Sequence, residues 1–472
     1  MQRVRHEIKA ANSREKQPGA VVGRDHSGKW HVAVDSQAKH CSSLFARPHR
    51  SCFLDCSYQY FVFSGSATDG VQTCSRVLNR FNTAHAELTL TTTVHMPASK
   101  ITVPFYGHGR QYHSIKQEVD TAIQAVLETE AYVMGPTGER FERELAQFFG
   151  MKHAIGVNSG TDALWLVFTA LGLRPGDEVI TTTNTFFATA EAIWIAGGKV
   201  VFVDSINETN NIDPGKIRGA ITPRTVGIVP VHLYVQCADM IAVSAVAKEY
   251  KLWVVEDNAQ GIDGHGDRFR QGELSDAVCT SFIIQKNLGT FGDGGAVITN
   301  RSDIDNAVRQ LRNHGSLKRS VHSFGFNSRL DDLHAGILSV KLKHVTKWTD
   351  RRRTWARRYD AGLKHTSLKL PYEVPGYRHV YHLYVVEHPK RDHLERYLRE
   401  AGIDGKMHYP IAIHQQQGFP WKKDFALPAA VPNSERNAAE CLSLPMFPEL
   451  TQEEVDYTIA KVVEWDDRVG RK

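Results

Sequence analysis

The sequence lacks any apolar run long enough to cross a bilayer, and it is poor in cysteine, with seven in 472 residues. A membrane-spanning helix needs about 20 mostly apolar residues, so no membrane protein is expected. So few cysteines, without a recognisable signal peptide, argue against a disulfide framework and favour reduced thiols in the cytoplasm. His49, Cys52, Cys56 and Cys74 do not have the spacing of a common zinc site, so no metal is predicted.

A strong charge of one sign is also missing. The 57 basic residues exceed the 52 acidic residues only slightly, which gives a formal net charge of +5. This excess is too small to indicate nucleic-acid binding, although it leaves room for a local basic pocket that binds an anionic small molecule. With 42% hydrophobic and 23% charged residues, the composition is that of a globular protein with a sizeable core.

The length suggests two or three domains of roughly 150 residues each. Residues 1–95 contain short apolar patches and scattered His, Ser and Cys, without sustained helical or strand periodicity. We expect an extension of unknown structure there, either disordered or preceding a natural start at Met96.

Residues 96–349 show the alternation that is typical of an α/β domain. Amphipathic helices are predicted at residues 114–130 and 141–150, and later helices alternate with seven short runs rich in Val and Ile. These runs are HAIGV, DEVITTT, KVVFVD, TVGIVPVHL, LWVVED, AVCTSFI and GGAVIT. Such runs are typical of strands covered on both faces, so we predict a large domain built on a mostly parallel, seven-stranded sheet.

Residues 350–472 are predicted to form a smaller C-terminal α+β domain. A charged helix, KWTDRRRTWARRYDAGL, leads into it, and its arginine run is expected to be a solvated helix face. HVYHLYVVEH is predicted to be an alternating strand, and RDHLERYLREAGI and EEVDYTIAKVVEW are predicted to be helices.

One candidate site lies at the start of a predicted helix. Ser159, Gly160 and Thr161 precede an apolar-periodic segment, so their backbone amides gather at the positive end of a helix, which favours an anion such as phosphate. The alternative is ordinary N-capping by Ser159 or Thr161.

A carboxylate and a lysine follow later in the chain. Asp257 ends a buried strand, at the sheet edge where α/β proteins bind ligands, and Gln260 can reach the same ligand. Lys286 follows the next strand and precedes the glycine-rich FGDGG turn. Alone, Asp257 would be read as a turn or cap, and Lys286 as an exposed loop lysine. Together with the helix start, they provide a phosphate anchor, a partner for a pyridinium nitrogen and an amine, as pyridoxal phosphate requires.

From about residue 100 to the C-terminus, the sequence resembles the sugar-nucleotide aminotransferases of the DegT/DnrJ/StrS type, which share the fold of type I pyridoxal phosphate enzymes. The resemblance does not reach the first 95 residues. The matching stretches include GPTGERFERELAQFFG, NSGTDAL, RPGDEVITTTNTFFATA, VVEDNAQG, SFIIQKNLGTFGDGGAVIT, GFNSRLDDLHAGIL, HYP and LSLPMFP.

This resemblance implies roles for residues by position. Lys286 would be the catalytic residue, which forms the Schiff base with pyridoxal 5'-phosphate and then moves a proton. Asp257 would hold the pyridine nitrogen, Gln260 would lie near the ring hydroxyl, and Phe186 would stack on the ring. The residues that would hold the phosphate are Gly160, Thr161, Ser281 and, from the second subunit, Asn327. A homodimer would then be the catalytic unit.

The resemblance also implies the substrates, a keto sugar attached to a nucleoside diphosphate and glutamate as the amino donor. Lys318, Arg319 and Arg329 flank the Asn327 segment and are candidates for contacting the diphosphate, and His322 and His408 are further candidates for substrate contacts. The motifs are most similar to those of enzymes that aminate dTDP-3-keto-6-deoxyhexoses, whereas 4-keto and UDP-linked sugars stay open alternatives.

One segment departs from the family's pattern. The family usually has an aromatic residue, a proline and a small residue before the lysine, where this chain has Ile283, Ile284 and Gln285. We expect this change to alter the fit of the substrate. Two rival hypotheses stay open: a sugar dehydratase, although the family's dehydratases have histidine where Lys286 stands, and a non-catalytic regulator that kept the cofactor pocket.

Overall fold

The computed structural model describes residues 101–471, apart from 317, 319 and 418–424, and six short strands within the first 100 residues. Met1–Lys100 and Ile101–Lys472 form two separate compact units. The strands of the first unit form one sheet in chain order, antiparallel except between β2 and β3. They are β1 (Val21–Arg24), β2 (Trp30–Ala33), β3 (Phe53–Cys56), β4 (Gln59–Ser64), β5 (Gln72–Val77) and β6 (Leu90–Val94). His49 and Cys52, two of the zinc candidates, lie outside the described residues.

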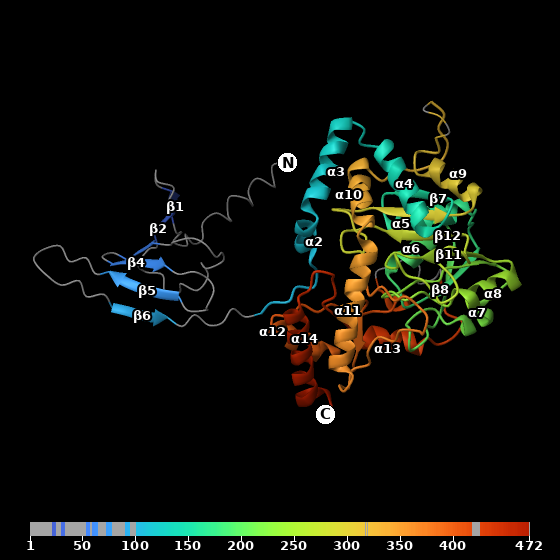
Figure 1. Ribbon diagram of the computed structural model, residues 1–472. Coiled ribbons are helices and arrows are strands. Elements are labelled where there is room, and N and C mark those ends of the chain that lie inside the picture. The colour runs from blue at the N-terminus through green and yellow to red at the C-terminus, as the bar shows by residue number, and fades with distance from the viewer. Residues whose placement is uncertain are drawn as a thin grey trace, which may run out of the picture. The chain divides into compact units, whose positions relative to one another are not determined.

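An eight-stranded sheet forms the centre of the second unit (Figure 1), in the order β15-β9-β8-β10-β11-β12-β13-β7. Only β13 runs antiparallel to its neighbours, so the prediction of a mostly parallel sheet is confirmed. The seven Val and Ile runs supply β7 (His153–Val157), β8 (Glu178–Thr182), β9 (Lys199–Val203), β10 (Thr225–Ile228), β11 (Trp253–Asp257), β12 (Ala277–Ser281) and β13 (Gly295–Thr299). The two-residue strand β15 (Phe425–Ala426) adds an eighth strand parallel to β9.

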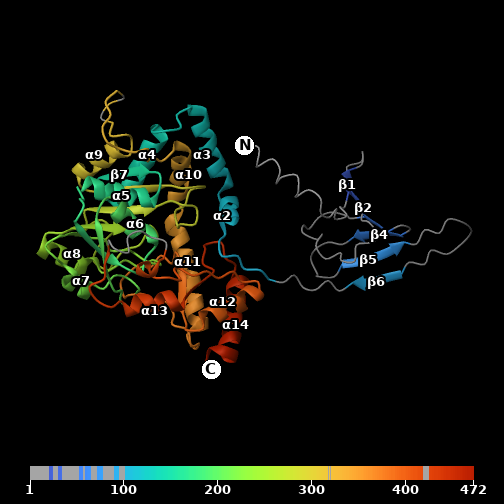
Figure 2. The ribbon, with the colours of Figure 1, turned by 180° about the vertical axis from the view of Figure 1, so that it is seen from behind.

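Helices cover both faces of this sheet, as the views from the front and from behind show (Figures 1 and 2). One face is covered by side chains of α5 (Gly160–Ala170), α6 (Phe187–Ile195) and α9 (Ser302–Leu311), which form the first core. The other face is covered by side chains of α4 (Pro136–Phe149), α7 (Pro214–Ala220), α8 (Met240–Tyr250) and α10 (Asp332–Leu342). Adjacent residues along a strand belong to the cores on opposite faces of the sheet, because successive side chains of a strand point to opposite faces. Ile155 and Val179, for example, face α5, whereas Ala154 and Ile180 belong to the other cores.

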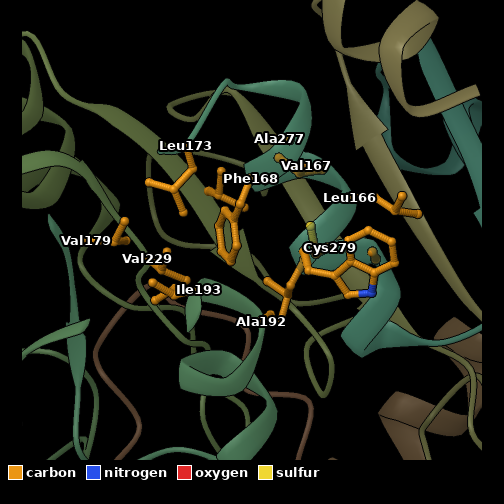
Figure 3. Packing of buried hydrophobic residues seen from close by; sticks show 14 of the residues in the cluster. Leu166, Val167, Phe168, Leu173, Val179, Ala192, Ile193, Val229, Ala277 and Cys279 are labelled. Carbon is orange, nitrogen blue, oxygen red and sulfur yellow. The ribbon is translucent and has the colours of Figure 1, made fainter. Parts of the chain in front are cut away.

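Phe168 of α5 lies at the centre of the first core, where Figure 3 shows it among Leu173, Ile193 and Val229. Burying such a side chain contributes about 1.5–3 kcal/mol to folding, so this packing fixes α5 firmly on the sheet. The helices of this part are α2 (His108–Ser114), α3 (Lys116–Thr129), α4 (Pro136–Phe149), α5 (Gly160–Ala170), α6 (Phe187–Ile195), α7 (Pro214–Ala220), α8 (Met240–Tyr250), α9 (Ser302–Leu311) and α10 (Asp332–Leu342).

The C-terminal part has its own core, which includes Trp355, Tyr359, Leu398 and Trp465. Its elements are α11 (Val345–Leu363), β14 (Tyr384–Glu387), α12 (Arg391–Glu400), η1 (Ile413–Gln415), α13 (Pro432–Glu440), β16 (Cys441–Leu444), α14 (Gln452–Trp465) and a π-helical turn, η3 (Asp466–Gly470). β14 and β16 form an antiparallel pair. The domain boundary at residue 350 stays a prediction.

Two details of the C-terminal part differ from expectation. The strand predicted over residues 379–388 begins only at Tyr384, because the amides of Val380 and Leu383 instead donate to loop carbonyls of Val235 and Tyr234. The expectation of a solvated arginine face is wrong for Arg352, which is 5% exposed. Its guanidinium donates to backbone carbonyls, which include those of Tyr381 and Met446 at 3.2 and 2.7 Å. In the part of the chain that the structure describes, no helix is long and apolar enough to cross a membrane.

Candidate active site

A cavity of about 320 Å³ lies beyond the carboxyl ends of the parallel strands. Its walls come from the segments that follow β7, β8, β10, β11 and β12, and from two segments of the C-terminal part. Ligands bind at this edge in open α/β sheets. The predicted site residues that line the cavity are Gly160, Thr161, Phe186, Asp257, Gln260, Ser281, Lys286 and His408.

The start of α5 forms one end of the cavity. Ser159 caps this helix, since its hydroxyl accepts a hydrogen bond of 3.0 Å from the amide of Asp162. Ser159 is therefore an N-cap, as the alternative interpretation predicts, and the remaining backbone amides at the positive helix end are available to an anion. A Cβ added to Gly160 would lie 2.7 Å from the Cβ of Ser281, so only glycine allows the two segments to approach so closely.

Asp257 lies on the floor of the cavity and is 5% exposed. Its carboxylate accepts hydrogen bonds from the Thr189 hydroxyl at 2.7 Å and from the Ala259 amide at 3.1 Å. Burial raises the pKa of Asp257, while these two hydrogen bonds and the charge of Lys286 oppose the rise. A buried carboxylate in this position is best stabilised by a cation, and a protonated ring nitrogen is one.

Lys286 lies in a turn after β12 and is half-buried. The backbone of this turn is closed by the Lys286 amide, which donates to the carbonyl of Ile283 at 2.9 Å. Burial lowers the pKa of Lys286 to about 8, against the attraction of Asp257. A lysine with this pKa is partly an uncharged amine near neutral pH, the form that acts as nucleophile and base.

Aromatic side chains form a further wall. The rings of Phe186 and Tyr409 lie 5.3 Å apart between centroids, and the side chain of Phe186 is 53% exposed. Gln260 accepts a hydrogen bond from the amide of Tyr234 at 2.9 Å and donates to the Tyr409 hydroxyl at 3.3 Å. A flat ring can therefore be placed against Phe186 with a fixed amide beside it.

His408 completes the wall from the C-terminal part. Its Nδ1 lies 2.8 Å from the hydroxyl of Ser443. Burial, followed by the charges of Lys286 and Lys406, lowers the pKa of His408 to about 4. This histidine is therefore an uncharged hydrogen-bonding group at neutral pH, so its substrate contact would be a hydrogen bond rather than an ion pair with the diphosphate.

The structure does not bring all predicted residues to this cavity. Arg329 donates to the side chain of Asn313 at 3.1 Å and lines a different hollow, and Asn327 is exposed. Arg319 lies outside the described residues. The predicted residues that do not line the cavity are Lys318, His322, Asn327 and Arg329.

Sequence reasoning missed several residues of the site, among them three that contact or flank the predicted ones. Thr189 binds Asp257, while His382 and Tyr409 line the cavity from the C-terminal part. Thr189 and Tyr409 fall within stretches that carry the family resemblance, NTFFATA and HYP, which is the signal that could have found them. His382 falls in the segment that the sequence predicts to be a strand, and no motif marks it.

The fold, an α/β unit with a large, mostly parallel sheet, is that of the fold type I aminotransferases, to which the structural neighbours belong. The chain itself belongs to the DegT/DnrJ/EryC1/StrS aminotransferase family, whose profile matches residues 113–463. The prediction of an aminotransferase of this family is confirmed.

Relatives match most of the chain. A protein of Geobacillus stearothermophilus named pleiotropic regulatory protein is 42% identical over 370 residues, which cover 77% of this chain and 98% of the relative. The dTDP-3-amino-3,4,6-trideoxy-alpha-D-glucose transaminase of Streptomyces venezuelae is 39% identical over 375 residues, or 78% of this chain and 97% of that enzyme. The crystal structure of Streptomyces venezuelae DesV, in complex with a ketimine intermediate, has a TM-score of 0.76 and 38% identity and covers 78% of this chain and 99% of that one.

Proposed function

We propose that the protein transfers an amino group from L-glutamate to a keto group of a hexose attached to a nucleoside diphosphate. The observation that carries the proposal is that one cavity is lined by Lys286, Asp257 and the closely packed pair of Gly160 and Ser281. The relative that is named a transaminase of a dTDP-linked 3-amino sugar supports dTDP-3-keto-6-deoxyhexoses as the first sugar class to test, before 4-keto and UDP-linked sugars.

The residues of the cavity fit pyridoxal 5'-phosphate as the cofactor. Gly160, Thr161 and Ser281 would hold its phosphate, Asp257 its ring nitrogen and Phe186 one face of its ring. The close approach of Gly160 to Ser281 and the buried carboxylate of Asp257 are the structural features that match these needs. When bound, the cofactor supplies an electron sink and a carbonyl group that carries the amino group between the two substrates.

The chain's own residues contribute proton transfer and positioning. The lowered pKa of Lys286 allows its Nζ to take up a proton and return it near neutral pH. Asp257 keeps its charge close to a protonated ring nitrogen, and Thr189 fixes the direction of that carboxylate through a hydrogen bond of 2.7 Å. Ping-pong kinetics are expected, because glutamate and the sugar use the same cavity one after the other and the first product leaves before the second substrate binds.

We further propose that the catalytic unit is a homodimer. Asn327 is exposed and does not line the cavity of its own chain, which is consistent with a side chain that serves a second subunit. Mixing Asn327→Ala chains with Lys286→Ala chains tests this, because only a hybrid dimer would contain one intact site. Recovery of activity on mixing is expected, and no recovery in mixtures that do form dimers would contradict a shared site.

The proposed activity can be tested by the visible spectrum of the cofactor-loaded protein before and after L-glutamate, followed by borohydride trapping and peptide mapping. We expect glutamate to shift the band and the trapped cofactor to map to Lys286. The variant Lys286→Arg keeps the positive charge but not the reactive amine, and should show neither effect. A cofactor that maps to another lysine, or no cofactor binding, would contradict the proposal. Binding without any response to a series of amino donors would instead favour a cofactor-binding regulator.

A further inference from the structure

His382 is a buried histidine of the cavity that the proposed mechanism does not use. It lies two residues before β14, is 6% exposed and lines the cavity that contains Lys286. Its ring is connected to the lysine segment, because its Nδ1 lies 3.2 Å from Oδ1 of Asn287, the residue that follows Lys286.

The hydrogen bonds of Asn287 determine which nitrogen of His382 carries the proton. The Asn287 amide nitrogen donates to the carbonyl of Val380 at 3.2 Å, and a carbonyl can only accept. The Asn287 oxygen must therefore face His382, where it accepts a hydrogen bond from Nδ1–H. A neutral imidazole protonated at Nδ1 has a lone pair at Nε2.

This lone pair has no partner among the described residues 101–471, since the structure shows no hydrogen bond to Nε2 there. Burial, and then the positive charges of Lys286 and Arg352, lower the pKa of His382 well below its ordinary value. The ring is therefore held as a neutral acceptor in a side chain that lines the cavity.

We propose that His382 is a specificity-determining residue whose Nε2 accepts a hydrogen bond from a hydroxyl group of the sugar substrate. This inference rests on the proposed function, which supplies the sugar. A ligand atom that faces a lone pair must donate a hydrogen, and the hydroxyl groups of a hexose can do so. The two carboxylates of glutamate cannot, and they would be repelled by the lone pair, while the amino group of glutamate, its one donor, is the group that reacts. His382 should thus favour the sugar over the amino acid at this wall.

The test separates the two half-reactions of the cofactor-loaded protein, each followed by stopped-flow absorbance. One half-reaction uses L-glutamate, and the other uses dTDP-3-amino-3,4,6-trideoxy-D-glucose and a UDP-linked 3-amino sugar in the reverse direction. In His382→Leu, we expect kcat/KM for the sugar to fall about 10- to 100-fold, the effect of losing one buried hydrogen bond. This fall should exceed that for glutamate by about fivefold or more.

His379→Leu is the matched control. His379 is also buried, at 4% exposure, and its Nδ1 accepts a hydrogen bond from the Tyr381 amide at 3.0 Å, but it does not line the cavity. Its replacement should change both half-reactions by the same factor. Equal losses in both half-reactions of His382→Leu would overturn the inference, because they would show that the histidine only supports the lysine segment. An unchanged sugar half-reaction would overturn it as well.

The tautomer can be measured without any sugar. In protein labelled with ¹⁵N-histidine, the His382 signals, assigned by their loss in His382→Leu, should show a proton on Nδ1 and none on Nε2. A protonated Nε2 at neutral pH would overturn the inference even if sugars react. A wild-type protein that reacts with glutamate but with neither sugar would overturn the proposed function and, with it, the sugar ligand assigned to His382. If sugars do react, the proposed function stands, and the ratio of the two half-reactions and the tautomer of His382 test the inference separately.

Discussion

Replacing Lys286 with methionine is expected to stabilise the cofactor-free protein at neutral pH, because burying an ammonium group is costly. Burial lowers the pKa of Lys286 from 10.5 to about 8. Each pKa unit corresponds to about 1.4 kcal/mol, so the native state pays about 3 kcal/mol at pH 7 to keep this lysine protonated. Methionine has a similar length and no charge, and it removes this cost. This figure of about 3 kcal/mol already includes the attraction of Asp257, because the pKa of about 8 is the net result of burial and of that attraction.

The pH dependence gives the sharper test. Between about pH 8 and 10.5 the unfolded chain binds more protons at this lysine than the folded chain does, so the stability of the wild type rises with pH. The advantage of Lys286→Met is therefore largest below pH 8 and disappears above about pH 10.5. Urea unfolding at several pH values, followed by tryptophan fluorescence, measures this difference. Lys347→Met, at an exposed position of α11, is the control and should show no such trend.

An advantage of Lys286→Met that is absent at pH 7, or that grows with pH, would refute the reasoning. The first result would show that the ammonium group is solvated in the folded protein. The second would show that the lysine stabilises the native state, as it would if a strong ion pair with Asp257 outweighed its burial.

Two further substitutions test the phosphate site and a buried ion pair elsewhere in the second unit. Gly160→Ala should raise the dissociation constant of pyridoxal phosphate about 10-fold or more, because the added Cβ would lie 2.7 Å from the Cβ of Ser281. Equilibrium dialysis measures this, Gly219→Ala in open space is the control, and an unchanged constant would contradict the phosphate site. Glu142→Gln should lower the free energy of unfolding by about 3 kcal/mol in urea titrations, since it leaves the buried Arg312 guanidinium without a counter-charge. A loss below about 1 kcal/mol would show that solvent screens this pair.

Much of the central sheet could be predicted from the sequence, because each strand is buried on both faces and therefore appears as a run of Val and Ile. HAIGV and GGAVIT lie at opposite ends of the domain sequence and still form neighbouring strands, an order that no run reveals by itself. The short strand β15 carries no periodic signal, and α2 has no buried residue in its seven positions. Elements of this kind are set by tertiary contacts rather than by their own sequences.

The site was predictable where its residues follow strands directly. Asp257 and Lys286 carry chemistry that is unusual at the ends of buried strands, and both line the cavity. His382 and Tyr409 reach it from positions 96 and 123 residues after Lys286, so no spacing indicates them. The apolar alternation before β14 predicts a strand, but the amides of Val380 and Leu383 in this segment donate to loop carbonyls instead.

The most direct test of the central claim is the transfer of nitrogen from ¹⁵N-labelled L-glutamate to a nucleotide sugar. The cofactor-loaded protein is incubated with the labelled amino acid and dTDP-3-keto-6-deoxyhexose, 4-keto and UDP-linked keto sugars, and the products are analysed by mass spectrometry. A labelled amino sugar that forms with the wild type and not with Lys286→Arg is the predicted result. If 2-oxoglutarate forms on the cofactor-loaded protein but no sugar acquires the label, the protein is an aminotransferase whose acceptor is not a nucleotide sugar of these classes, and the account is contradicted.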